Sequence, residues 1–301
     1  MMLKQSLLIS FLLVSIFIKA QTRDYTNWFD YGSGHISKWL MIAPAKLGPN
    51  ALPVPRMNYG LLQTQHSLEI GTDAHFMTGD KALNTYVNLK WSVAPEKVMI
   101  EIWGNPTETF RTSNELRDER QIYYDDTGRI THQGDLWIST NIQLLTNRKN
   151  LPDIVLNYSV STTTGINLQG RYIDAPISYL YLAFGKSFFM EDSFVDEIRI
   201  AGMGGWYIWQ TNKVEMAQDE GPLVELGIQI KMKNACLIQE IGGYQGYDAY
   251  DFIGKRGYND PLIYRSRLEY QLKKVLLKAE YQIGLKDYFY QTTRLSGTVS
   301  F

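Results

Sequence analysis

The chain of 301 residues has a single cysteine, Cys236, so no disulfide can form within one copy. Its four histidines, His35, His66, His75 and His132, are not spaced as metal ligands are, and no glycine-rich phosphate loop leads from a strand into a helix. The net charge is −1 at pH 7 and the basic residues form no stripe, which argues against nucleic acid as a partner. We therefore expect no metal and no other cofactor.

Residues 1–20 have the features of a secretory signal peptide. Lys4 gives a short positive region, residues 7–18 form an apolar run, and Ala20 is a small residue suited to cleavage before Gln21. The apolar run of roughly 13 residues is shorter than the about 20 that a membrane-spanning helix needs, and a retained anchor is the alternative. No cysteine follows the cleavage position, so a lipoprotein is not expected.

Beyond residue 66, apolar and polar residues alternate with a period of two, as in β-strands with one apolar face. Leu136, Ile138 and Ile142 share one face of such a segment, for example, and helical spacing would scatter the polar residues between them around a cylinder. We therefore predict one all-β domain, 67–301. The predicted strands are 67–76, 83–93, 98–104, 134–144, 152–162, 177–186, 196–208, 223–233, 236–244, 263–272, 275–286 and 290–301.

The lengths of the predicted connections alternate along the chain. Every second connection is brief, as at 94–97, 234–235 and 273–274, with only 187–195 longer. The connections between them are long and polar, and they are 105–133, 163–176, 209–222 and 245–262. Transmembrane barrels have an even strand number, short periplasmic turns and longer extracellular loops, whereas a soluble sandwich has no reason to sort its loops. We predict an antiparallel transmembrane β-barrel of about 12 strands.

The last predicted strand alternates up to a terminal aromatic residue. Leu295, Val299 and Phe301 share its apolar face, opposite Arg294 and Ser296. This ending resembles the C-terminal assembly signal of bacterial outer-membrane β-barrel proteins, although Ser296 stands where a glycine is often found. The resemblance covers only the end of the chain and defines no narrower family. It implies recognition by the barrel-assembly machinery, contact with outer-membrane lipid, and location in the outer membrane of a Gram-negative bacterium.

Residues 21–66 precede the predicted barrel and contain four prolines. The stretch 51–55 must be extended, because proline disfavours helix and cannot donate to a central strand. The apolar run 39–42 requires burial. Three arrangements remain open for this extension: a plug threaded through the lumen, a cap on the periplasmic mouth, or a mobile segment.

Ionisable side chains on the inward faces of the predicted strands are unevenly distributed. The early strands contribute Glu69, Asp73, Glu101 and Asp135, and the late strands contribute Arg265, Arg267, Lys278 and Arg294. Lys90, Glu269 and Glu280 interrupt this segregation. Opposed acidic and basic walls would orient charged solutes in a pore, whereas pairing would rigidify a closed barrel. Closure of the barrel would in either case place Arg294 near Glu69 and Asp73.

The sequence offers few candidates for catalysis. Asp73 and His75 share an inward face and are a candidate pair of orienting residue and base, or otherwise a polar pair in the lumen. His66 and Ser67 are adjacent and point to opposite faces, and Cys236 is interpreted as a small apolar residue. We expect a channel or porin-like protein for small hydrophilic solutes. The alternatives are a structural or surface-interaction barrel and, behind it, a membrane-embedded hydrolase.

Overall fold

The computed structural model describes residues 42–120, 129–146, 148–165, 170–191, 193–210, 218–246 and 259–301. The predicted signal peptide and the first half of the extension, 21–41, lie outside the described residues. No helix in the described part of the chain is long and apolar enough to span a membrane.

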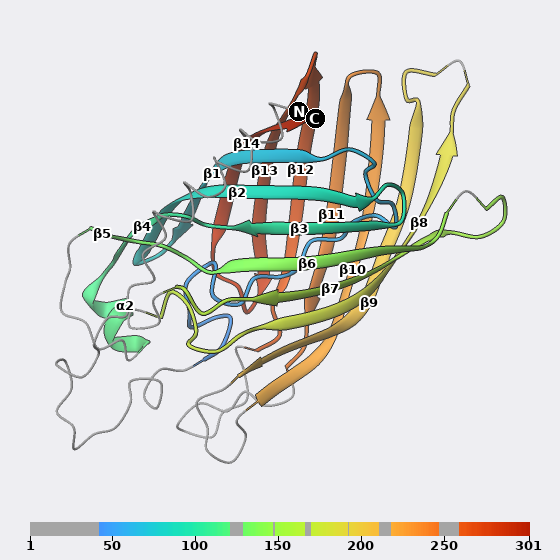
Figure 1. The fold of residues 1–301 in the computed structure, drawn as a ribbon. Coiled ribbons are helices and arrows are strands. Elements are labelled where there is room, and N and C mark those ends of the chain that lie inside the picture. Colours follow the sequence, from blue (N-terminus) through green and yellow to red (C-terminus); the bar gives the residue numbers. More distant parts are fainter. Residues whose placement is uncertain are drawn as a thin grey trace, which may run out of the picture. The chain divides into compact units, whose positions relative to one another are not determined.

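Within these residues, twelve strands form a closed antiparallel barrel (Figure 1), which confirms the predicted fold class. The strands are β1 (Ser67–Met77), β2 (Asp80–Ala94), β3 (Val98–Gly104), β6 (Leu136–Leu145), β7 (Asp153–Ser161), β8 (Ser178–Phe189), β9 (Glu197–Gln210), β10 (Gln218–Met232), β11 (Ala235–Tyr244), β12 (Leu262–Leu272), β13 (Val275–Lys286) and β14 (Gln291–Ser300). Each pairs with the next around the barrel, and β1 pairs with both β2 and β14. Closure leaves no open sheet edge.

The outer face of the barrel is apolar. Large apolar side chains at alternate strand positions stay exposed, among them Ile70 at 58%, Leu226 at 61% and Leu295 at 62%. Their polar neighbours in sequence point inward, and Glu69 and Glu225 are buried. This inside-out distribution is typical of strands that face lipid.

The two ends of the barrel differ in their connections. At one end, which we call the short-turn end, the strands are joined by 95–97, 146–152, 190–196, 233–234 and 273–274. At the other, the long-loop end, the connections include 105–135, 162–177 and 245–261, although 78–79 and 287–290 are short. The alternation of loop lengths therefore follows the predicted order of strands.

Two predicted loops contain more regular structure than expected. The loop 105–133 includes β4 (Glu108–Thr112), α2 (Asn114–Glu119) and β5 (Ile130–His132), and β4 pairs with the outer part of β2. Five and three residues are too short for periodicity to identify strands. The loop 209–222 is shorter than predicted, because β9 ends at Gln210 and β10 already begins at Gln218. Pro222 is tolerated in β10 because of its position beyond the end of β11. Its carbonyl accepts from the Gln245 amide on that side of the strand, where the pairing with β11 has ended, so the missing N–H of proline interrupts no ladder.

The end of the chain closes the barrel at the short-turn end. The Phe301 amide donates to the His66 carbonyl over 3.0 Å, and the His66 ring stacks on Trp91 with centroids 4.1 Å apart. Leu295, Val299 and Phe301 are exposed on the outer, apolar face. These side chains are therefore accessible to another protein before lipid surrounds them.

Deletion of Phe301 is expected to lower the amount of folded barrel in the outer membrane severalfold. It removes the terminal aromatic residue of the proposed assembly signal and the amide that His66 binds. Heat-modifiable electrophoretic mobility of membrane fractions measures the folded amount, with Phe301→Tyr as the control that keeps the ring. Unchanged yield of the folded form after deletion would remove Phe301 from the signal.

Candidate functional site

Residues 42–66, which we call the thread, precede β1 and run through the barrel (Figure 1), with 42–60 inside it and 61–65 mostly exposed at the short-turn end. At the long-loop end, the Gly48 amide donates to the Gly170 carbonyl over 2.6 Å. At the short-turn end, the Gln63 side chain donates to the Ser67 hydroxyl over 2.6 Å. The thread therefore traverses the lumen from the long-loop end to the short-turn end before the chain enters its first strand.

Side chains of the barrel wall bind the backbone carbonyls of the thread. Its prolines keep it out of the sheet, so its buried carbonyls need other donors. Three tyrosine hydroxyls and two arginines supply them. The pairs are Tyr288 to Pro49 (3.2 Å), Tyr244 to Leu52 (2.9 Å), Tyr181 to Arg56 (3.0 Å), Arg265 to Val54 (3.3 Å) and Arg199 to Tyr59 (3.0 Å). The wall thus holds the thread along most of its length.

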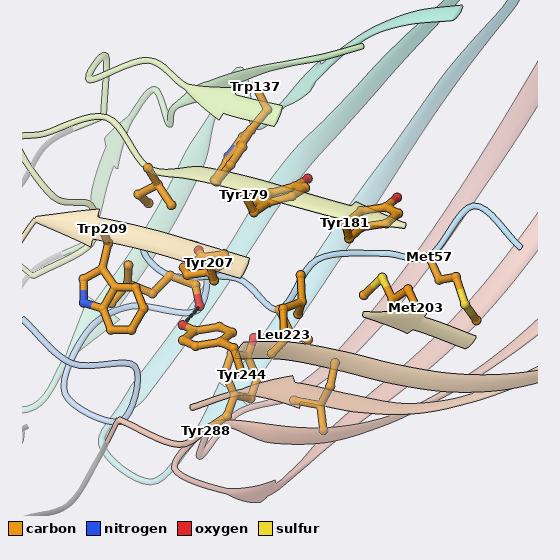
Figure 2. Packing of buried hydrophobic residues seen from close by; sticks show 14 of the residues in the cluster. Met57, Trp137, Tyr179, Tyr181, Met203, Tyr207, Trp209, Leu223, Tyr244 and Tyr288 are labelled. Carbon is orange, nitrogen blue, oxygen red and sulfur yellow. Dashed lines mark hydrogen bonds between the residues drawn. The ribbon is translucent and has the colours of Figure 1, made fainter. Parts of the chain in front are cut away.

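A row of aromatic rings on the inner wall packs near the apolar half of the thread, residues 42–54 (Figure 2). Trp103 stacks on Trp137 with centroids 5.1 Å apart, and Tyr207 stacks on Tyr244 at 4.1 Å. Tyr179 lies between these pairs, 5.4 Å from Trp137 and 5.9 Å from Tyr207. The thread contributes seven residues to the same buried cluster, and they are Ile42, Leu47, Ala51, Leu52, Val54, Met57 and Tyr59. Burial of these large rings stabilises the closed arrangement.

Ion pairs and hydrogen bonds hold the polar half of the thread, residues 55–66. The Arg56 guanidinium donates to both carboxylate oxygens of Glu280 in β13, each over 2.5 Å. The Tyr59 hydroxyl donates to Glu240 in β11 over 2.9 Å, and the Asn58 amide donates to Asn141 in β6 over 3.0 Å. A bidentate arginine–carboxylate pair is among the stronger side-chain contacts, so Arg56 is the main anchor of this half.

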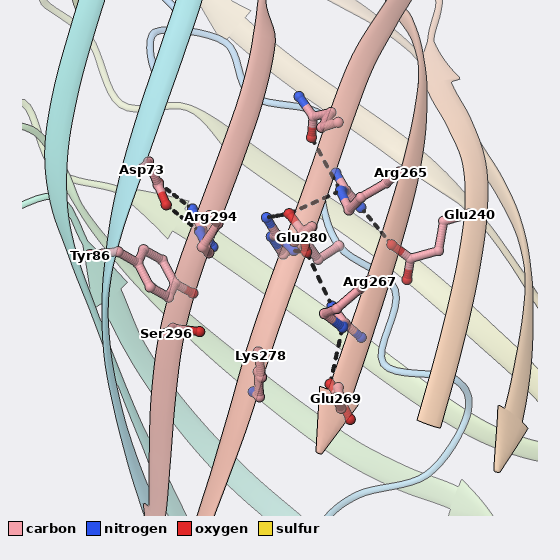
Figure 3. Close-up of polar contacts among 12 residues, drawn as sticks. Asp73, Tyr86, Glu240, Arg265, Arg267, Glu269, Lys278, Glu280, Arg294 and Ser296 are labelled. Carbon is pink, nitrogen blue, oxygen red and sulfur yellow. Dashed lines mark hydrogen bonds and ion pairs between the residues drawn. The ribbon is translucent and has the colours of Figure 1, made fainter. Parts of the chain in front are cut away.

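The four basic residues predicted for the lumen all pair with carboxylates. Figure 3 shows the pairs that the three arginines make. The pairs are Arg265 with Glu240 (3.0 Å), Arg267 with Glu269 (3.0 Å) and Glu280 (3.5 Å), Lys278 with Glu69 (2.7 Å), and Arg294 with Asp73 (2.5 Å). Because β14 lies beside β1, the acids of β1 and the bases of β13 and β14 meet at the seam. They form neighbouring pairs there and not opposed walls.

The other two predicted acidic residues lie away from this seam. Glu101 of β3 accepts from the Asn88 side chain over 2.6 Å and lies 3.8 Å from Lys90. Asp135, just before β6, is buried and accepts from the Gly165 amide over 2.7 Å. Burial raises the pKa of Asp135 to about 7, against backbone hydrogen bonds from Gly165 and Thr164 that lower it. The charge of Asp135 therefore changes near neutral pH.

The candidate catalytic pair is not brought together. His75 lies within 2.8 Å of the Thr292 hydroxyl and 2.9 Å of the Asn84 side chain, one at each ring nitrogen. Asp73 binds Arg294 instead of orienting His75. Cys236 is a half-buried free thiol in β11. The geometry of these residues gives no support to hydrolysis.

Several residues of the occupied lumen were missing from the sequence prediction. Arg56 stands in a proline-containing stretch with no periodicity, and Glu280 counted only as an interruption of the charge segregation. The hydroxyls of Tyr181 and Tyr244 bind the thread, and only the position of these residues on the inward face of their strands could have indicated this role. Their partners are thread carbonyls, which no sequence pattern marks.

Cavities remain beside the thread. One, the aromatic cavity, has a volume of about 90 Å³ and lies between thread residues 49–56 and the wall. It is lined by Trp103, Trp137, Tyr86, Arg56 and Arg294, among others. Another, of about 100 Å³, lies nearer the short-turn end and is lined by residues that include Gln63, Glu69 and Lys278.

Comparisons with known proteins address the fold. No protein-family model matches the chain, and no curated protein matches it. An outer membrane channel from Pseudomonas putida F1 has a TM-score of 0.53 and 12% identity, covering 83% of this chain and 100% of that one. The NanC porin has a TM-score of 0.49 and 8% identity, covering 78% of this chain and 100% of that one. The KdgM porin has a TM-score of 0.43 and 9% identity, covering 77% of this chain and 99% of that one. The likeness to the Pseudomonas putida channel concerns the fold alone, and that fold is an outer-membrane β-barrel.

Proposed function

We propose that the protein is an outer-membrane channel for small hydrophilic solutes whose lumen is closed by the thread. The observation that carries this proposal is that wall side chains, and not sheet pairing, hold the thread. Such contacts can be exchanged for water or solute without breaking the barrel, because the sheet ladder is untouched. The apolar outer face and the sorting of loop lengths support placement in the outer membrane, inserted by the assembly machinery, with the long-loop end outside.

The two halves of the thread suggest how the lumen opens. The apolar half packs with the aromatic row, and Leu47 and Ala51 are completely buried. Met57 and Tyr59 of the polar half are also buried, but its end is less covered, and Leu61 and Gln63 are exposed. We infer that the polar half moves while the apolar half stays in place, and that the Arg56–Glu280 pair controls this movement.

Arg56→Gln is therefore expected to raise the open probability severalfold in planar bilayers. The substitution removes the bidentate pair that fixes the polar half, and leaves the wall intact. Lys278→Gln is the matched control, because it also removes one positive charge from the lumen but breaks only a pair within the wall. Both variants should shift selectivity toward cations, and only Arg56→Gln should open the channel. If both variants stayed closed in the bilayer, the result would favour a structural barrel.

A further inference from the structure

Three guanidinium groups line the aromatic cavity. The Arg265 side chain is only 2% exposed, and its nitrogens donate to Gln282, Glu240 and the Val54 carbonyl, which leaves Arg56 and Arg294 for a ligand. Arg56 reaches it from the thread and Arg294 from β14. The Arg56 side chain is 32% exposed and that of its partner Glu280 only 2%, and the corresponding values for Arg294 and Asp73 are 13% and 0%. The positive groups therefore face the cavity, while the carboxylates that neutralise them lie behind in the wall.

Both arginines retain donors for a ligand. Asp73 takes Nε and one terminal nitrogen of Arg294, and Glu280 takes the two terminal nitrogens of Arg56. A guanidinium has five N–H donors, so each group has more donors than its carboxylate occupies. The two positive charges line the same cavity of about 90 Å³, so they repel each other. An anion between them would accept these donors and remove the repulsion.

The rest of the cavity suits the body of a small organic molecule. The Arg294 guanidinium lies 3.6 Å from the Tyr86 ring centroid, which fixes its orientation. Trp103, Trp137, Tyr179 and Tyr181 add aromatic surface to the lining. A volume of about 90 Å³ holds a solute of a few non-hydrogen atoms or several waters.

Two acidic residues also line the cavity and oppose an anion there. Glu101 is engaged by Asn88 and Lys90, and Asp135 binds the Gly165 amide. Among the described residues, neither forms a hydrogen bond or ion pair with Arg56 or Arg294, so these two guanidinium groups remain available.

We propose that the aromatic cavity binds a small organic anion, whose carboxylate bridges Arg56 and Arg294 while its body lies against the aromatic rings. That this anion belongs to the class of solute admitted by the channel rests on the proposed function. The binding site itself does not require conduction. Because one arginine belongs to the thread and the other to the wall, the site exists only while the thread occupies the lumen.

Calorimetric titration of the folded full-length protein in detergent tests the site at constant ionic strength. The probes are propionate and propionamide, which have the same shape and differ in charge. Propionate is expected to bind at least tenfold more tightly. Arg56→Gln and Arg294→Gln should each weaken propionate binding by about ten- to a hundredfold, the range for a lost charge-assisted hydrogen bond. Lys278→Gln, which removes a positive charge outside this cavity, should change the affinity less than twofold.

Arg294→Lys keeps a positive charge beside Asp73 if Arg294→Gln fails to fold, and it should weaken binding severalfold through loss of the planar fork. Equal affinity for the two probes, no binding of either, or equal weakening by Lys278→Gln would overturn the proposal. If propionate does not bind but Arg56→Gln still opens the channel, the binding site is rejected and the proposed function stands. Propionate binding to a barrel that never conducts would reject the channel and leave the site.

Discussion

Alanine at Gly185 is expected to displace the polar half of the thread and to leave the barrel conducting. Gly185 lies in β8 where the thread passes, and an added Cβ would overlap the carbonyl oxygen of Tyr59 and lie 2.6 Å from the Arg199 side chain. Tyr59 and Gly60 have φ of 57° and 74°, so this turn of the thread cannot adjust freely. Overpacking of this kind costs about 1–3 kcal/mol. Planar-bilayer recording should show a severalfold increase in open probability.

Gly204→Ala is the control for this substitution. Gly204 lies in β9, and a Cβ there meets no atom within 4 Å. The same change of residue type should therefore leave both conductance and the apparent unfolding temperature unchanged. A Gly185→Ala channel as closed as the parent would mean that the thread does not fit closely against β8.

Arg171→Met is expected to produce the largest loss of stability. Arg171 is completely buried at the long-loop end and pairs with Asp80 over 2.5 Å and with Glu108. Its removal leaves two buried carboxylates without their main partner, which costs about 3–5 kcal/mol. The apparent unfolding temperature, read from heat-modifiable mobility, should fall on the order of 10 °C.

Lys286→Met provides the comparison for this loss. Lys286 pairs with Asp260 over 3.1 Å at the same end of the barrel, but 58% of the Lys286 side chain and 32% of the Asp260 side chain are exposed. An exposed pair contributes about 0–1 kcal/mol, so the unfolding temperature should change little. A small effect of Arg171→Met, similar to that of Lys286→Met, would show that the buried cluster does not order the long-loop end.

The barrel could be predicted because its strands face lipid on one side and the lumen on the other. That contrast imposes a period of two along every strand, and closure then places Asp73 opposite Arg294, as the register shows. The cluster at the long-loop end could not be predicted in this way. Arg171 and Asp80 are 91 residues apart, and Arg171 lies in a loop, where no periodicity relates its position to that of Asp80 at the start of β2.

The thread was only partly predictable. Its prolines indicated an extended segment outside the sheet, and that left a plug, a cap or a mobile segment open, with the mobile segment least expected because the apolar run 39–42 requires burial. What distinguishes them is contact with tyrosine hydroxyls and arginines of β8, β9, β11 and β12. Since those donors bind backbone carbonyls, they select for no particular thread side chain and leave no pattern in the sequence.

Single-channel recording of the unaltered protein in a planar bilayer tests closure by the thread. A lumen occupied by residues 42–60 predicts long closed periods interrupted by rare openings. The apolar half of the thread should stay in place during those openings, so their conductance should stay below that of an empty twelve-stranded barrel. A stable, ohmic conductance that begins with each insertion and never closes would contradict the occupied lumen.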